Sequence, residues 1–237
     1  MKMKSRGKIP ADPKQRIFDA AAKLFVRKGY EAVGVREIVK MAKVNIAMVK
    51  YYFGSKSGIL LEIMETAYQK YHQASRGAGD ETKPPEERTR IFIRNIVRFF
   101  EENTEIALVT FNTMPFDIPE VLCVKKKWAE LNYSVLGSHF QQLSIDLNDP
   151  VHNSVYNGFL GSMILNHFQR RYAIEHMKQP QGDEQCEEPV GRMPKPLPKS
   201  FKFDGTFYDQ YSELLVDQYY YGVRHAIMKH KERNSVV

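Results

Sequence analysis

The stretch of residues 35–53 restricts the fold more than any other part of the sequence. Ile38, Val39 and Ala42 follow Val35 at spacings of three and four residues, so a short helix here has one apolar face. The residues directly after Ala42 allow only a turn before a second helical pattern begins. The stretch therefore predicts two short helices joined by a tight turn.

The second helix of this pair should have two unlike sides. Asn45 is a good N-cap for it, and the pattern predicts a helix from Ile46 to Phe53. Val49 and Phe53 lie four residues apart and should pack inward. The opposite side carries a Lys and a Tyr beside apolar residues. Such a surface is suited to contact base edges in a DNA groove, and we call it the reading face.

Such a helix fits the major groove with its N-terminal residues nearest the bases, while Lys and Tyr side chains reach phosphates. The residues expected to contact DNA are Arg36, Asn45, Ile46, Ala47, Met48, Lys50, Tyr51, Tyr52 and Lys56. Lys56 is included because it opens a further helix whose free backbone N–H groups can hold a phosphate. The alternative interpretation is an ordinary solvated or half-buried face.

Residues 14–61 resemble the DNA-binding domain of the tetracycline-repressor (TetR) family. The matching segments are IFDAAAKLFVRKGYEAVGVREIV, NIAMVKYYF and GSKSGILL. Three positions depart from the usual pattern: Gly34 replaces a Thr or Ser cap, Lys43 replaces a Gly, and Lys50 replaces a Tyr or Asn. A residue other than Gly with positive φ at position 43 costs about 1 kcal/mol.

The positive charge is concentrated at the same end of the chain. The net charge is +7, but residues 1–56 hold 14 Lys and Arg against 4 Asp and Glu, and the remainder holds 21 against 24. An excess of this kind is expected for a domain that binds phosphates. A basic tail that only aids solubility is the alternative.

The patterns predict an all-α protein: an N-terminal three-helix helix-turn-helix domain followed by a larger helical ligand-binding and dimerisation domain. No strand alternation or hairpin turn competes with this. The predicted parts are a flexible basic arm (1–12), the helix-turn-helix domain (13–56) and the helical domain (57–237), which contains a proline-rich loop (178–205). The helices expected in the second domain span 87–103, 105–112, 118–145, 150–177 and 206–231.

The last two predicted helices are apolar around most of their circumference. A helix of this kind needs burial on more than one side. We therefore expect both helices to pack on their own domain and on a second subunit, and the family resemblance implies a four-helix dimer interface. A two-fold homodimer suits a palindromic double-stranded DNA operator.

A largely apolar cavity between the middle helices is expected to take a hydrophobic or aromatic effector. The residues predicted to line it are Phe111, Met114, Trp128, Phe159, Met163 and His167. Each of them is equally suited to a place in the hydrophobic core.

Motifs of other functional classes are missing from the sequence. The seven histidines show no ligand spacing with cysteine, and no HExxH, GxSxG, GxGxxG or Walker pattern occurs, so we expect no enzyme, no metal and no cofactor. No apolar run is long enough for a signal peptide or a membrane span. Two cysteines make no disulfide framework, and a reduced cytoplasmic location is expected.

These observations predict a sequence-specific transcriptional regulator, which the resemblance suggests is a repressor released from its operator by a small effector. One alternative is a DNA-binding regulator controlled by a protein partner through the proline-rich loop, with no small-molecule effector. An enzyme fused to a basic domain would need a polar cluster in a cleft, for which the sequence offers no candidate.

Overall fold

We describe the protein from a computed structural model that covers residues 12–112, 115, 117–146, 148–176 and 202–234. Every regular element in these residues is helical, which confirms the predicted all-α class. The predicted basic arm lies outside the described residues except for Asp12. Most of the proline-rich loop and the candidate pocket residue Met114 also lie outside them.

The chain divides into two compact units, one made of residues 1–75 and 102–135 and the other of residues 76–101 and 136–237. This division differs from the boundary expected after residue 56, because more helices group with the helix-turn-helix than the sequence suggested. The first unit contains α1 (Pro13–Lys28), α2 (Val35–Ala42), α3 (Ala47–Phe53), α4 (Lys56–Ser75), α6 (Thr104–Asn112) and most of α7 (Pro119–Gln142).

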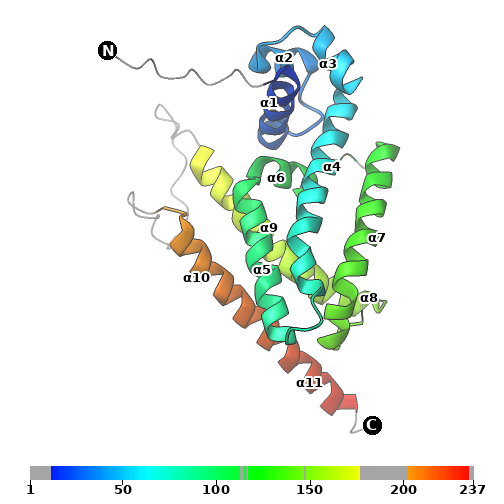
Figure 1. The fold of residues 1–237 in the computed structure, drawn as a ribbon, viewed down its shortest axis with the longest axis vertical. Coiled ribbons are helices and arrows are strands. Elements are labelled where there is room, and N and C mark those ends of the chain that lie inside the picture. Colours follow the sequence, from blue (N-terminus) through cyan, green and yellow to red (C-terminus); the bar gives the residue numbers. More distant parts are fainter. Residues whose placement is uncertain (1–11, 113–114, 116, 147, 177–201, 235–237) are drawn as a thin grey trace, which may run out of the picture. The chain divides into compact units, whose positions relative to one another are not determined.

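Helix α1 packs against α2, α3, α4 and α6 in the first unit. It opens with Pro13 at its first position, where a missing N–H costs nothing, and Ile17 and Phe25 in its apolar stripe are fully buried. Gly29 ends the helix with a φ of 80° and donates its N–H to the Phe25 carbonyl oxygen at 2.9 Å. Figure 1 shows α1, α2 and α3 as one cluster beside the first turns of α4.

The turn between α2 and α3 has the strained geometry that the sequence suggested. Lys43 adopts a left-handed conformation with φ 55° and ψ 50°, a region that favours glycine. Its carbonyl oxygen accepts a hydrogen bond of 3.4 Å from Arg16 of α1. The turn between α2 and α3 thus forms with Lys43 at the position where this conformation usually requires a glycine.

Helix α4 begins at Lys56, and the hydroxyl of Ser55 directly before it accepts a hydrogen bond of 3.0 Å from the Gly58 N–H. Its buried residues include Ile59, Leu60, Ile63 and Met64. The N-terminal half of α4 packs on α1 and α3 within the first unit. Helix α3 is therefore followed directly by, and packed on, a helix of 20 residues.

The second unit contains a short 3₁₀ helix (Arg76–Gly79), α5 (Pro85–Glu102), the last turns of α7 and the helices near the C-terminus. These helices are α8 (Pro150–His152), α9 (Gly158–His176), α10 (Gly205–Val216) and α11 (Gly222–Asn234). A π-helical segment joins α8 to α9 (Asn153–Asn157), and another joins α10 to α11 (Asp217–Tyr221). The two long helices predicted here are therefore each interrupted by a π turn, which periodicity alone does not reveal.

A buried polar group lies where α5 meets the end of α7. Arg88 has no exposed surface, and its guanidinium donates to the Ala78 carbonyl oxygen at 2.6 Å, to Gln142 at 2.5 Å and to Ser138 at 3.1 Å. The neighbouring His139 is 1% exposed. These polar contacts set the register of α5 against α7 inside the second unit.

Candidate functional site

The predicted reading face of α3 is exposed. Ile46 is 51% exposed and Tyr51 80%, while Val49 on the inner side is 3% exposed. The remaining residues of the predicted face, Ala47, Met48 and Lys50, are exposed as well. The structure thus brings short apolar side chains, a Lys and a Tyr together on one solvent-facing side of a short helix.

The start of α3 is held by Asn45. Its side-chain oxygen accepts a hydrogen bond of 2.9 Å from the Ala47 N–H, and its carbonyl oxygen accepts one of 3.0 Å from the Met48 N–H. The helix itself begins at Ala47, one residue later than predicted. Asn45 therefore orients the N-terminal turn, the part of a recognition helix that lies nearest to base edges.

The cationic groups of the predicted interface have different surroundings. Lys50 and Arg36 are exposed and make no ion pair with any described residue. Lys56, by contrast, is half-buried and donates to the Tyr30 carbonyl oxygen at 3.1 Å. Tyr52 is also half-buried, and its ring packs edge-on against Tyr51 at 4.8 Å. Lys50, Arg36 and Tyr51 are consequently the groups with most freedom to reach phosphates.

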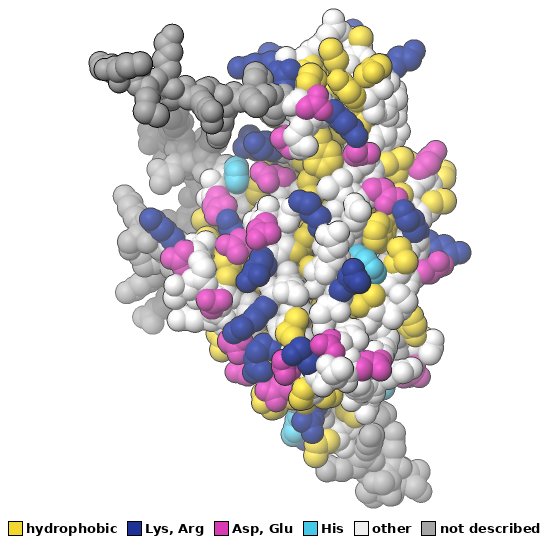
Figure 2. All heavy atoms as spheres, viewed as in Figure 1, with side chains coloured by type: hydrophobic (Ala, Val, Ile, Leu, Met, Phe, Trp, Pro, Cys, Tyr) yellow, Lys and Arg dark blue, Asp and Glu magenta, His cyan; other side chains and the backbone are white. Residues whose placement is uncertain are grey.

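Figure 2 shows hydrophobic side chains at the surface, with Lys and Arg beside them, at the end of the molecule that carries α2 and α3. This mixture agrees with the exposed apolar residues of the reading face. An apolar surface of this kind can pack on thymine methyl groups, while the cations reach the backbone.

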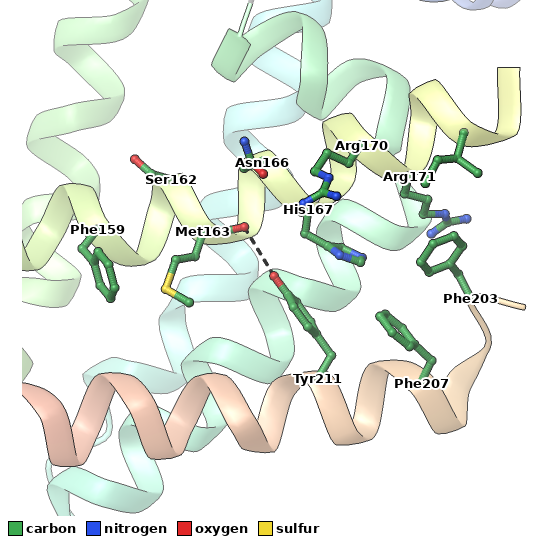
Figure 3. Close-up of a pocket in the computed structure, with 11 residues that line it drawn as sticks. Phe159, Ser162, Met163, Asn166, His167, Arg170, Arg171, Phe203, Phe207 and Tyr211 are labelled. Carbon is green, nitrogen blue, oxygen red and sulfur yellow. Dashed lines mark hydrogen bonds between the residues drawn. The ribbon is translucent and has the colours of Figure 1, made fainter. Parts of the chain in front are cut away.

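A second candidate site lies within the other unit, between α9 and α10 (Figure 3). It is an open pocket of about 660 Å³, a size that suits a small organic ligand. Phe159, Met163 and His167, all predicted from the sequence, lie on its α9 side. The other lining residues are Ser162, Asn166, Arg170, Arg171, Ile174, Phe203, Phe207 and Tyr211.

Two predicted pocket residues, Phe111 and Trp128, instead belong to an aromatic cluster of the first unit. The Tyr68 ring lies 5.4 Å from Phe111 and 6.2 Å from Trp128 between centroids. Trp128 is 7% exposed, and its indole N–H donates to Glu65 of α4 at 2.6 Å. Phe111 and Trp128 therefore do not line the α9–α10 pocket, because they take part in the aromatic packing around α4 and α7.

His167 lies among aromatic rings inside the pocket. Its ring centre is 4.4 Å from that of Tyr211 and 5.4 Å from that of Phe207. Burial and the nearby guanidinium groups of Arg171 and Arg170 lower the pKa of His167 to about 4, so the imidazole is neutral at pH 7. The Nε2 atom is buried and has no hydrogen-bond partner among the described residues.

The sequence did not identify the α10 side of this pocket. Phe207 and Tyr211 lie four residues apart on α10 and therefore share a helix face, which is a usable signal, whereas Phe203 precedes the helix. Nothing in the sequence says, however, that this face meets the face of α9 that carries Met163, His167 and Arg170. That pairing depends on the tertiary packing.

Two further features of the described residues concern metal binding and membranes. No group of three or more His, Cys, Asp or Glu side chains that could hold a metal ion occurs among them. No helix in this part of the chain has both the length and the apolar character that crossing a bilayer requires.

The geometry thus defines a helix-turn-helix domain with an exposed second helix, joined to a further set of helices. The sequence model described as "Bacterial regulatory proteins, tetR family" matches residues 17–63. The N-terminal domain of this chain is therefore similar to the DNA-binding domain of that family.

Two curated relatives share part of the sequence. One is a probable HTH-type transcriptional regulator, YttP, of Bacillus subtilis, with 26% identity over 44% of this chain and 51% of the relative. The other is the HTH-type transcriptional repressor NicS of Pseudomonas putida, with 28% identity over 39% of this chain and 44% of the relative. The chain thus spans about half the length, or less, of these relatives.

The fold also resembles a solved structure over most of the chain. A TetR-like transcriptional regulator from Rhodococcus sp. RHA1 superposes with a TM-score of 0.59 and 16% identity, over 92% of this chain and 98% of that one. Identity at this level is evidence for the fold alone. The helical part that follows the N-terminal domain therefore also has the architecture of a TetR-like regulator.

Proposed function

We propose that this protein is a sequence-specific DNA-binding transcriptional regulator that acts as a homodimer on a palindromic operator. The observation that carries the proposal is the exposed face of α3, with Ile46, Lys50 and Tyr51 directed to solvent on a domain that matches the tetR family. Ile46, Ala47 and Met48 would contact base edges, and Lys50, Tyr51, Tyr52 and Arg36 would bind phosphates.

The dimer would form through the helices near the C-terminus. Several large apolar side chains there are exposed in the single chain: Leu214 on α10, Tyr221 after it and Met228 on α11. Exposed apolar area of this kind favours association. A two-fold dimer places two α3 helices on half-sites one helical turn, about 34–36 Å, or a multiple of it apart.

Regulation would come from a small hydrophobic or aromatic effector in the α9–α10 pocket, which releases the repressor from its operator. The ligand can act only by binding the DNA-free conformation more tightly than the DNA-bound one. The presence of a pocket of about 660 Å³ favours this over the second candidate, a regulator controlled by a protein partner with no small-molecule effector.

Selection of bound duplexes from a random library tests the proposal. The expected result is an enriched palindrome with two half-sites, and no enrichment would overturn it. Ala47→Glu is a sharp variant, because a carboxylate at the first turn of α3 is favourable for the helix yet repels phosphates. It should abolish selection without lowering the melting temperature, while Ala129→Glu at an exposed position of α7 should leave selection intact.

A further inference from the structure

The α9–α10 pocket has an aromatic wall. The rings of Phe207 and Tyr211 lie 5.8 Å apart between centroids with planes 11° apart, and the His167 ring is inclined by 21° to the first and 31° to the second. Figure 3 shows these three rings between the two helices, with Met163 on the α9 side. These three rings in mutual contact give the pocket an aromatic side on which an apolar ligand body can pack.

The charges around this wall all have one sign. The lining residues include Arg170 and Arg171 but no Asp or Glu. Arg171 is already engaged, since it donates to Glu175 at 2.9 Å and to the Tyr208 hydroxyl at 2.7 Å. Arg170 is exposed and forms no ion pair with any described residue. One guanidinium at the pocket is therefore available to an anion.

His167 contributes a buried polar atom next to the pocket. The Nε2 atom of His167 is inaccessible to solvent and has no partner in the described part of the chain, although a buried polar atom usually has one. Figure 3 places His167 next to Arg170 along α9. Because Nε2 is closed to solvent, a ligand in the pocket can reach the exposed guanidinium of Arg170 but not this atom.

We propose that the α9–α10 pocket binds an amphipathic carboxylate. Its aromatic or acyl body lies on the Phe207–Tyr211–His167 wall, and its carboxylate accepts hydrogen bonds from the guanidinium of Arg170. This assignment rests on the proposed function, since it names the chemical class of the effector, and it adds the anionic group that the sequence did not suggest. Charge-assisted hydrogen bonds to a guanidinium provide the selectivity for an acid over a neutral analogue.

Calorimetric titration of the full chain with matched probes tests this directly. The probes are 2-naphthoate against 2-naphthalenemethanol, and octanoate against 1-octanol, so that each acid has a neutral partner of similar shape. At least one acid should bind about tenfold or more tightly than its alcohol, as expected for one charge-assisted hydrogen bond. Equal affinities within both pairs, or no binding of any probe, would overturn the proposal.

Three variants locate the effect. Arg170→Gln should reduce the affinity of the preferred acid about tenfold and leave that of its alcohol unchanged. Arg98→Gln, at an exposed position of α5 outside the pocket lining, is the matched control and should change neither. Ser162→Trp, which fills the pocket from an exposed lining position, should abolish binding of both probes. An equal effect of the two arginine variants would count against the site.

The failures of this inference and of the proposed function are distinguishable. A chain that selects a palindrome but does not prefer acids keeps the function and loses the ligand assignment. A chain that prefers acids through Arg170 but selects no DNA shows the reverse. If no probe binds and Phe159→Asp converts a dimer into monomers in sedimentation, the pocket is covered by a second copy, and the carboxylate site is refuted.

Discussion

The Nζ atom of Lys56 lies 4.0 Å from the centre of the Tyr30 ring and donates to the Tyr30 carbonyl oxygen at 3.1 Å. This contact ties the first residue of α4 to the segment that connects α1 and α2. Tyr30 itself is 7% exposed and packs edge-on against Phe25 at 5.2 Å. Helix α4 is thereby held against α1 and the segment that follows it.

The substitution Lys56→Met should therefore act mainly on stability. It keeps the apolar stem over Tyr30 but removes one hydrogen bond and one cation–π contact, so the free energy of unfolding should fall by about 1 kcal/mol. Urea denaturation measures this, with Lys23→Met at an exposed position of α1 as the control. A normal stability combined with a lower salt dependence of DNA binding would instead assign Lys56 to a phosphate.

Lys50→Ala should act on DNA binding without affecting stability. Lys50 is exposed on α3 and has no ion pair among the described residues, so its removal should cost one phosphate contact. Affinity for all duplexes should fall alike, and the slope of log K against log salt should change by about 0.9. Fluorescence anisotropy at several salt concentrations measures both. Lys126→Ala, an exposed lysine of α7, should leave the slope unchanged, and an unchanged slope for Lys50→Ala would remove this contact.

Lys43→Gly should stabilise the protein. Lys43 has a φ of 55°, and glycine adopts this conformation without steric cost, although the greater freedom of the unfolded chain offsets part of the gain. The free energy of unfolding should rise by about 0.5–1 kcal/mol. Lys40→Gly, within the last turn of α2, should lower it by about 1 kcal/mol. Two changes of the same sign in thermal denaturation would contradict the strain at position 43.

Stability should fall in mild acid because of His139. The Thr89 hydroxyl donates to the Pro85 carbonyl oxygen at 2.8 Å, so it accepts from Nε2 of His139 at 3.1 Å and leaves Nδ1 unprotonated. Burial and the nearby Arg88 lower the pKa of His139 to about 4 from 6.5. The unfolded chain therefore binds a proton between these pH values and the folded chain does not.

The pKa of His139 is lower in the folded chain than in the unfolded chain, and this difference sets how stability changes with pH. The contribution of His139 to stability is complete above pH 6.5 and is lost as the pH falls toward 4; it amounts to about 2 kcal/mol between pH 7 and pH 5. Urea denaturation at the two pH values should show a smaller difference for His139→Gln than for the wild type. His225→Gln, exposed on α11, should retain the full difference. Equal differences in all three proteins would show that His139 is not the source.

The local elements were predictable because their causes are local. Pro13 at the start of α1, Ser55 before α4 and the apolar spacing of residues 35–42 act over a few residues, so the helix-turn-helix could be located to within one residue. The exposure of Ile46, Lys50 and Tyr51 follows from the same periodicity, since Val49 and Phe53 cannot face inward unless those residues face outward. The two π-helical segments were not predicted, because an inserted residue only shifts the apolar pattern, and such a shift cannot be recognised in helices that are apolar around most of their circumference.

The pocket shows the limit of this reasoning. Phe111, Trp128, Phe159, Met163 and His167 are all large residues on helices, and periodicity assigns each of them to a buried or half-buried face. Whether such a residue fills a core or borders a cavity depends on which other helix meets that face. For Trp128 the facing partners are Tyr68 and Glu65, and for His167 they are Phe207 and Tyr211.

By itself the sequence determined the helices, the reading face of α3 and the concentration of positive charge at the N-terminal end, because these depend on residue spacing and residue type. Tertiary structure alone decided that Lys56 is held by Tyr30, that Arg88 and His139 share a buried polar site, and that Arg170 borders an aromatic pocket. The physical reason is that a side chain's partners across a helix interface come from distant positions in the chain. Burial and charge pairing at such an interface exist only once the helices have packed.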